Sequence, residues 1–214
     1  MLVISLTTIP PRYGQLPQVL TALLGQGADR VALVVPRRFA RVLPAPLPPL
    51  PQGVEVLETE ADLGPAGKLL APARAFPGAD ILYCDDDWLY APGWAAALRS
   101  AHRPGQVTAA STWKSERIGR KGGPIAQGFG GVLVSANLAR QIPAPPPEAW
   151  AVDDIWLSGY FAALGLAIRS VPGARTLMTP LASPAALQDH TPRDGANRRA
   201  AEIVHRRFGI WPPI

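Results

Sequence analysis

The chain of 214 residues contains a single cysteine, Cys84, at the end of the short apolar run 81–84. One cysteine excludes an intrachain disulfide and a cysteine-based metal cluster, and an apolar setting is typical of a small buried side chain. No run of 18 apolar residues is present, which argues against a membrane-spanning helix. The first residues lack the basic stretch of a secretion signal, so we expect a cytoplasmic protein.

Charged residues are also sparse, at 17% of the chain, and aromatic residues make up 7%. The net charge of +5 comes from 21 basic and 16 acidic side chains, a mild excess that suits an anionic ligand such as a nucleotide or loose contact with an acidic membrane. Basic and aromatic residues are not interleaved as in a strand-binding groove. We therefore expect no nucleic acid partner.

What is present is a globular pattern, with 48% hydrophobic residues. Apolar runs of strand length, such as 2–7, 31–35 and 81–84, alternate with segments of helical spacing, such as 16–24 and 195–207. The alternation predicts an α/β fold with a mostly parallel sheet flanked by helices. The length and the absence of a composition shift predict a single domain.

Three consecutive aspartates, Asp85, Asp86 and Asp87, follow the apolar run 81–84 directly. Burying adjacent carboxylates without partners costs several kcal/mol each, about 2 or more by transfer estimates, so we expect them where the strand leaves the core. Side chains two residues apart in a strand point the same way. Asp85 and Asp87 therefore share one face and suit Mg²⁺ or Mn²⁺, unless the triplet is only a solvated acidic turn.

A second acidic pair, Asp153 and Asp154, opens a segment of helical spacing. One aspartate at a helix start is explained by capping of free N–H groups and by the helix dipole. The other is then available as a general base. We favour Asp153 as the base and Asp154 as the cap.

Together these motifs resemble the GT-A (Rossmann-like) fold of nucleotide-sugar-dependent glycosyltransferases, in particular bacterial, family-2-like members. Residues 81–87 resemble the strand that ends in the family's DxD metal motif, with Asp85 and Asp87 at its acidic positions. Residues 152–157 resemble the later (E/D)D motif, which carries the catalytic base of inverting members.

The first strand and loop of the chain, Val-Ile-Ser-Leu-Thr-Thr-Ile-Pro-Pro-Arg at 3–12, look like the segment that holds the nucleotide in that family. The resemblance implies a nucleotide-binding half, 1–110, and an acceptor-side half, 111–214, that ends in a helix. Further residues that it suggests for binding the donor are Thr7, Thr8, Arg12, Asp62, Lys68, Asp86 and Gly130.

The resemblance implies a metal-dependent, hexosyltransferase-like enzyme that moves a sugar from a nucleoside diphosphate sugar, UDP more readily than GDP, to an acceptor hydroxyl. An inverting reaction in surface polysaccharide or glycolipid synthesis is expected, with a glycan or lipid-linked acceptor. Three alternatives stay open: a retaining transferase, a sugar-phosphate nucleotidyltransferase and a non-catalytic binding protein of the same fold. The short chain also makes a homodimer or a peripheral membrane contact an expectation.

Several other residues have two interpretations. Lys68 contacts the diphosphate or Asp62, or else is a solvated surface lysine. His190 is a further metal ligand, or an exposed loop histidine. Trp113 and Trp150 stack on sugar rings or belong to the core. The C-terminal basic residues form a solvated helix face or dock on an anionic membrane: Arg193, Arg198, Arg199, Arg206 and Arg207.

Overall fold

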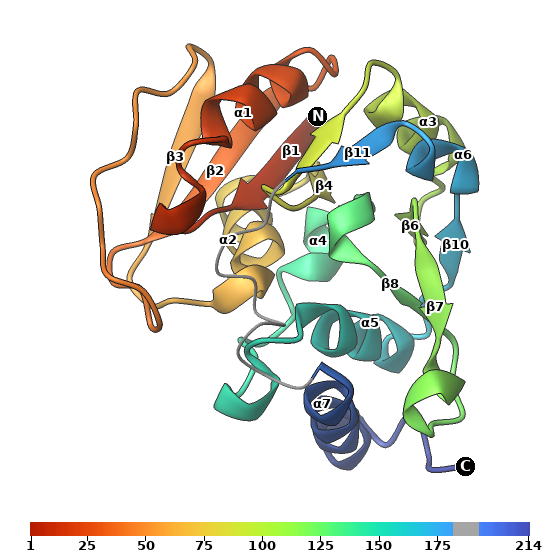
Figure 1. Ribbon diagram of the computed structural model, residues 1–214. Coiled ribbons are helices and arrows are strands. Elements are labelled where there is room, and N and C mark those ends of the chain that lie inside the picture. The colour runs from red at the N-terminus through yellow and green to blue at the C-terminus, as the bar shows by residue number, and fades with distance from the viewer. Residues whose placement is uncertain (182–192) are drawn as a thin grey trace.

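A computed structural model describes residues 1–181 and 193–214 of the chain. Figure 1 shows a central twisted sheet with helices on both of its faces. The first half contains β1 (Leu2–Thr7), α1 (Leu16–Leu24), β2 (Arg30–Pro36), β3 (Val54–Thr59), α2 (Gly67–Ala75), β4 (Asp80–Tyr83), β5 (Trp88–Tyr90), α3 (Trp94–Ala101) and β6 (Val107–Ala109). The second half contains β7 (Thr112–Lys114), β8 (Pro124–Ala126), β9 (Val132–Ser135), α4 (Ala136–Ala139), α5 (Asp153–Ala163), β10 (Ile168–Ser170), α6 (Pro172–Arg175), β11 (Met178–Pro180) and α7 (Arg193–Phe208).

Within the described residues the central sheet has seven strands, in the order β10-β6-β9-β4-β1-β2-β3. β9 runs antiparallel to both of its neighbours, and the other neighbouring pairs are parallel. The predicted mostly parallel α/β sheet is thus confirmed. Strands from both halves of the chain join this one sheet. Because β1 pairs in parallel with both β2 and β4, the carboxyl ends of these three strands lie at the same edge.

The sheet is buried on both faces because its strands alternate between two cores. Val3 and Ile81 pack on the side of α2, α4 and α5, whereas Ile4 and Leu82 pack on the side of α1 and α3. Continuous apolar strands are what a doubly covered parallel sheet requires. The three aspartates 85–87 follow the end of β4, so their carboxylates lie where the chain leaves the core, at the edge of the sheet.

The last helix, α7, packs against α5 below the sheet (Figure 1). Its bounds agree with the prediction of a helix over 195–207. Residues 115–123 contain the 3-10 turn Ser115–Ile118, and the bridge between Arg120 and Pro213 ties them to the end of the chain. In the part of the chain that the structure describes, every helix is too short or too polar to cross a membrane.

Candidate active site

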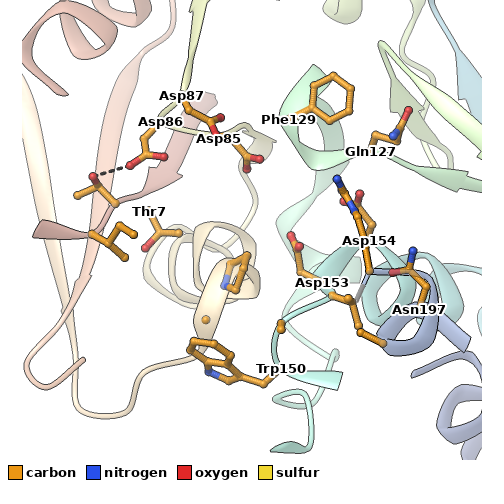
Figure 2. Close-up of a pocket in the computed structure, with 18 of the residues that line it drawn as sticks. Thr7, Asp85, Asp86, Asp87, Gln127, Phe129, Trp150, Asp153, Asp154 and Asn197 are labelled. Carbon is orange, nitrogen blue, oxygen red and sulfur yellow. Dashed lines mark hydrogen bonds between the residues drawn. The ribbon is translucent and has the colours of Figure 1, made fainter. Parts of the chain in front are cut away.

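A cleft of about 580 Å³ opens at the carboxyl ends of the central strands. This volume is typical of small-molecule sites, and the location is where open α/β sheets bind ligands. Figure 2 shows Asp85 and Asp87 on one side of the cleft and Asp153 and Asp154 on the other. Two acidic groups that lie 66 or more positions apart in sequence therefore face one cavity.

The three aspartates follow β4 and all line the cleft, but they differ in burial. Asp86 is buried, with 2% of its surface exposed, and it accepts hydrogen bonds of 2.6 Å from the Thr8 hydroxyl and from Arg12 Nη1. Asp85 and Asp87 are partly exposed, and Arg12 Nη1 also lies 3.3 Å from Asp87 Oδ2. Thr8 therefore fixes the position of Asp86, and Arg12 fixes the positions of Asp86 and Asp87.

Burial of Asp86 has an electrostatic consequence. Removal from water raises the pKa of its carboxyl to about 6, although Arg12 and the Thr8 hydroxyl oppose the rise. The carboxylate is thus held in place by partners that also compensate part of its desolvation. Both carboxylate oxygens of Asp86 are thus hydrogen-bonded inside the protein, to Thr8 and to Arg12.

Lys68 lies between the two acidic groups, in the first turn of α2. Its ammonium is 2.5 Å from Asp85 Oδ1 and 2.9 Å from Asp153 Oδ2, and only 2% of its side chain is exposed. Burial by itself lowers the pKa of Lys68, but the charges of Asp153, Asp85 and Asp154 outweigh it and leave the pKa well above its usual value. Neither the surface position nor the contact with Asp62 is found.

Asp153 and Asp154 open α5, in its first turn, where the helix dipole favours negative charge. The expected capping role of Asp154 was wrong, because the described residues supply no side-chain cap for this helix. Instead Asp154 Oδ1 accepts a 2.7 Å hydrogen bond from the Gly128 N–H. Burial, together with the charge of Asp153, raises the pKa of Asp154 to about 7.

Tyr90 and Trp94, which no sequence motif marks, join the aspartate triplet and the glycine-rich turn 128–131. The Tyr90 hydroxyl bonds to the backbone N–H and carbonyl of Asp85 and to the carbonyl of Phe129, at 2.9 to 3.1 Å. The Trp94 indole N–H donates to the Gly130 carbonyl over 2.9 Å. The available signal was two large aromatic residues with polar tips close behind the aspartate triplet.

The remaining predicted donor residues lie at the edges of this arrangement. The Thr7 hydroxyl donates to the Val34 carbonyl. Asp62 accepts from the N–H groups of Ala40 and Gly64, so its carboxylate shapes the loop that borders the cleft. At the glycine-rich turn, Gln127 and Phe129 line the cleft, whereas Gly130 faces Trp94 and Ser111. His190 lies outside the described residues.

Aromatic and basic side chains also line the cleft. They include Trp113 and Trp150, and the Arg117 guanidinium lies 5.4 Å from the centre of the Trp113 ring. The Trp150 indole N–H donates to the Asp62 carbonyl, which ties this ring to the loop that borders the cleft. Arg193 and Asn197, from the start of α7, line the cleft as well. A ligand in the cleft would therefore meet ring surfaces and positive charge besides the carboxylates.

The acidic edge fits a hard divalent cation. Asp85 and Asp87 present carboxylate oxygens to the cleft, the donor type that Mg²⁺ and Mn²⁺ prefer. Across 1–181 and 193–214 no cluster of three or more His, Cys, Asp or Glu side chains suits a metal. Two carboxylates are enough where substrate phosphates complete the coordination, so the residues present fit a metal that is shared with a diphosphate.

Comparison with solved structures identifies the fold. The mannosyltransferase PcManGT from Pyrobaculum calidifontis, in complex with GDP-Man and Mn²⁺, matches 99% of this chain and 65% of its own, with a TM-score of 0.67 and 14% identity. Glucosyl-3-phosphoglycerate synthase from Mycobacterium tuberculosis, in complex with Mn²⁺ and UDP-Glc, matches 98% of this chain and 79% of its own, with a TM-score of 0.61 and 12% identity. The chain has the GT-A fold.

Comparison of the sequence with known families and proteins does not assign a family to the chain. Neither a protein-family model nor a curated protein sequence matches the chain. The GT-A fold of the chain confirms the resemblance drawn from the DxD and (E/D)D motifs at the level of architecture. The roles of individual residues therefore depend on the geometry of the cleft.

Proposed function

We propose that this protein is a metal-dependent glycosyltransferase, which moves a sugar from a nucleoside diphosphate sugar to an acceptor hydroxyl. One observation carries the proposal. Asp85, at the metal position, and Asp153, at the base position, share the single ammonium of Lys68 across one cleft. The GT-A fold supports it, since solved structures of this fold include transferases in complex with UDP-Glc or GDP-Man and Mn²⁺.

The donor end of the cleft suits a diphosphate and a divalent cation. Asp85 and Asp87 would hold Mn²⁺ or Mg²⁺, and a bound cation supplies neutralisation of the charge that grows on the leaving diphosphate. Arg12 forms ion pairs with Asp86 and Asp87 and so fixes the positions of their carboxylates. Ile9 and Phe39 line the cleft, and we expect the nucleotide base to lie against them. We also expect UDP-sugars to bind more tightly than GDP-sugars.

The acceptor end requires a base for the attacking hydroxyl. Asp153 borders the cleft, and Lys68 holds its Oδ2. In our proposal Asp153 removes the hydroxyl proton as that oxygen attacks the anomeric carbon from the face opposite the diphosphate, which inverts the anomeric configuration. In a retaining reaction Asp153 would not serve as this base.

We further propose a cytoplasmic site of action on a glycan or lipid-linked acceptor in surface polysaccharide or glycolipid synthesis. Arg193 borders the cleft, and Arg207 lies over the rings of Trp156 and Phe208. Arg198, Arg199 and Arg206 are exposed on α7, and these are the residues that we expect to contact an anionic membrane. A homodimer stays a prediction.

Binding of the donor is tested by thermal shift with a panel of nucleotide sugars, each with and without Mn²⁺. We expect stabilisation by a UDP- or GDP-sugar that requires the metal and disappears in Asp87→Ala. Glu148→Gln, which changes an exposed carboxylate at the surface, is the control and should respond like the wild type. If no nucleotide sugar stabilises the protein with any metal, the proposal is wrong.

Catalysis is tested with Asp153→Asn. Donor binding should persist, while transfer or slow donor hydrolysis falls by about 10² to 10⁴, the usual range for loss of a general base. NMR of the anomeric proton of the product distinguishes inversion from retention. Full transfer activity in Asp153→Asn would exclude Asp153 as the base.

A further inference from the structure

Lys68 is a charged side chain that the protein buries between the two functional halves of the cleft. A buried ammonium is tolerated only where paired charges offset the loss of water. Here Asp85 Oδ1 and Asp153 Oδ2 supply that pairing, at 2.5 and 2.9 Å. The lysine therefore contacts the carboxylate proposed for the metal and the carboxylate proposed as the base.

The surrounding chain determines where this ammonium lies. A Cβ atom at Gly128 would come within 2.7 Å of Lys68 Nζ, so the glycine leaves the space that the lysine occupies. The Gly128 N–H is itself held by Asp154. On another side the ring centre of Tyr83 lies 5.8 Å from Nζ. The position of the charge is thus set by backbone and ring contacts as well as by its two ion pairs.

We propose that Lys68 couples the metal subsite to the base, because its charge competes with a divalent cation for Asp85 while it orients Asp153. The inference rests on the proposed function of the cleft. Like charges that share one carboxylate repel each other, and a partly buried pair is screened less than one in water. The ammonium consequently weakens metal binding at Asp85 and keeps Asp153 directed at the acceptor end.

Neutralising Lys68 then has two opposite effects. The metal subsite gains affinity, because a repelling charge is removed and Asp85, Asp153 and Asp154 lose their shared counter-ion. Transfer slows, because Asp153 is no longer held in place. A purely structural lysine would not produce the first effect, since loosening the site does not tighten metal binding.

The test measures Mn²⁺ binding by EPR of the free ion, without nucleotide, for the wild type, Lys68→Gln and Lys68→Arg. Glutamine is neutral but can still donate to Asp85, and arginine keeps the charge. We expect Lys68→Gln to bind Mn²⁺ about tenfold more tightly, within the usual range of coupling between sites. Lys68→Arg should stay within about threefold of the wild type, and kcat should fall in Lys68→Gln with little change in the donor KM.

The outcomes separate this inference from the proposed function. A wild-type protein that binds no Mn²⁺, with or without UDP or GDP, contradicts both. Wild-type binding with equal or weaker affinity in Lys68→Gln overturns the inference alone. If Lys68→Gln does not fold, a crystal structure of the wild type with Mn²⁺ and UDP decides. Lys68 Nζ within hydrogen-bond distance of Asp153, beside Mn²⁺ on Asp85, supports the coupling, and Nζ away from Asp153 refutes it.

Discussion

Replacing Asp154 with asparagine should stabilise the protein at neutral and alkaline pH. The carboxyl lies inside the site next to Asp153 and Lys68, and its Oδ1 accepts from the Gly128 N–H. Burial, with the charge of Asp153, raises its pKa from 3.8 to about 7. The folded state therefore disfavours the charged form. An asparagine of the same shape keeps an acceptor for Gly128 and carries no charge.

The magnitude and its sign follow from proton linkage. One pKa unit corresponds to about 1.4 kcal/mol, so the shift of Asp154 amounts to about 4 kcal/mol. Partial exposure of the residue reduces this, and we expect a gain of about 2 to 4 kcal/mol. Below about pH 4 both the folded and the unfolded chain hold the proton, and the gain vanishes. Between about pH 4 and 7 only the unfolded chain releases it, so wild-type stability falls as the pH rises.

The assay is urea unfolding of the wild type and Asp154→Asn at pH 5, 6, 7 and 8, followed by tryptophan fluorescence. The difference in unfolding free energy should grow with pH and level off above about pH 7. Glu148→Gln serves as the control and should stay within about 0.5 kcal/mol of the wild type at every pH. A variant that is less stable than the wild type at pH 8, or a difference that does not vary with pH, would refute the reasoning.

Three further predictions concern the framework of the site. Thr8→Val removes a hydroxyl donor from the buried carboxylate of Asp86 and should lower the unfolding free energy by about 1.5 to 3 kcal/mol, so an unchanged urea midpoint would contradict it. Gly131 has φ 95°, and a Cβ there would lie 2.2 Å from the Trp94 ring. Gly131→Ala should therefore lose about 3 kcal/mol or more, while Gly123→Ala, which has open space, should change stability by about 0.5 kcal/mol at most. Removal of divalent metal with EDTA should abolish stabilisation by nucleotide sugars, and added Mn²⁺ should restore it. Stabilisation that persists in EDTA would show that the metal is not needed for donor binding.

Much of the fold was readable from local pattern. Apolar runs and helical spacing identified β1, β2, β4 and α7 because buried strands and amphipathic helices record their neighbours in residue order. Short elements such as β5 and β11 were missed. They pair with each other across 88 or more positions, and no local pattern specifies a partner that far away.

The candidate site divides in the same way. Strand alternation was expected to separate Asp86 from Asp85 and Asp87. In the structure Asp86 is buried and its two neighbours are partly exposed, although all three follow the end of β4. The capping role of Asp154 and the contact of Lys68 with Asp62 were wrong, because both were inferred from near neighbours in the chain. Their actual partners, Gly128 for Asp154 and the Asp85–Asp153 pair for Lys68, are brought close only by packing.

The sequence by itself determined the sheet type, the position of the acidic strand end and the two acidic groups, since each depends on residue order within one element. Only the tertiary structure decided that Asp85 and Asp153 both contact the ammonium of Lys68. That proximity arises where α2, α5 and β4 converge, and it depends on the absence of a side chain at Gly128. The physical reason is that a buried charge selects its partners by distance in space and by dielectric, neither of which is a property of a single segment.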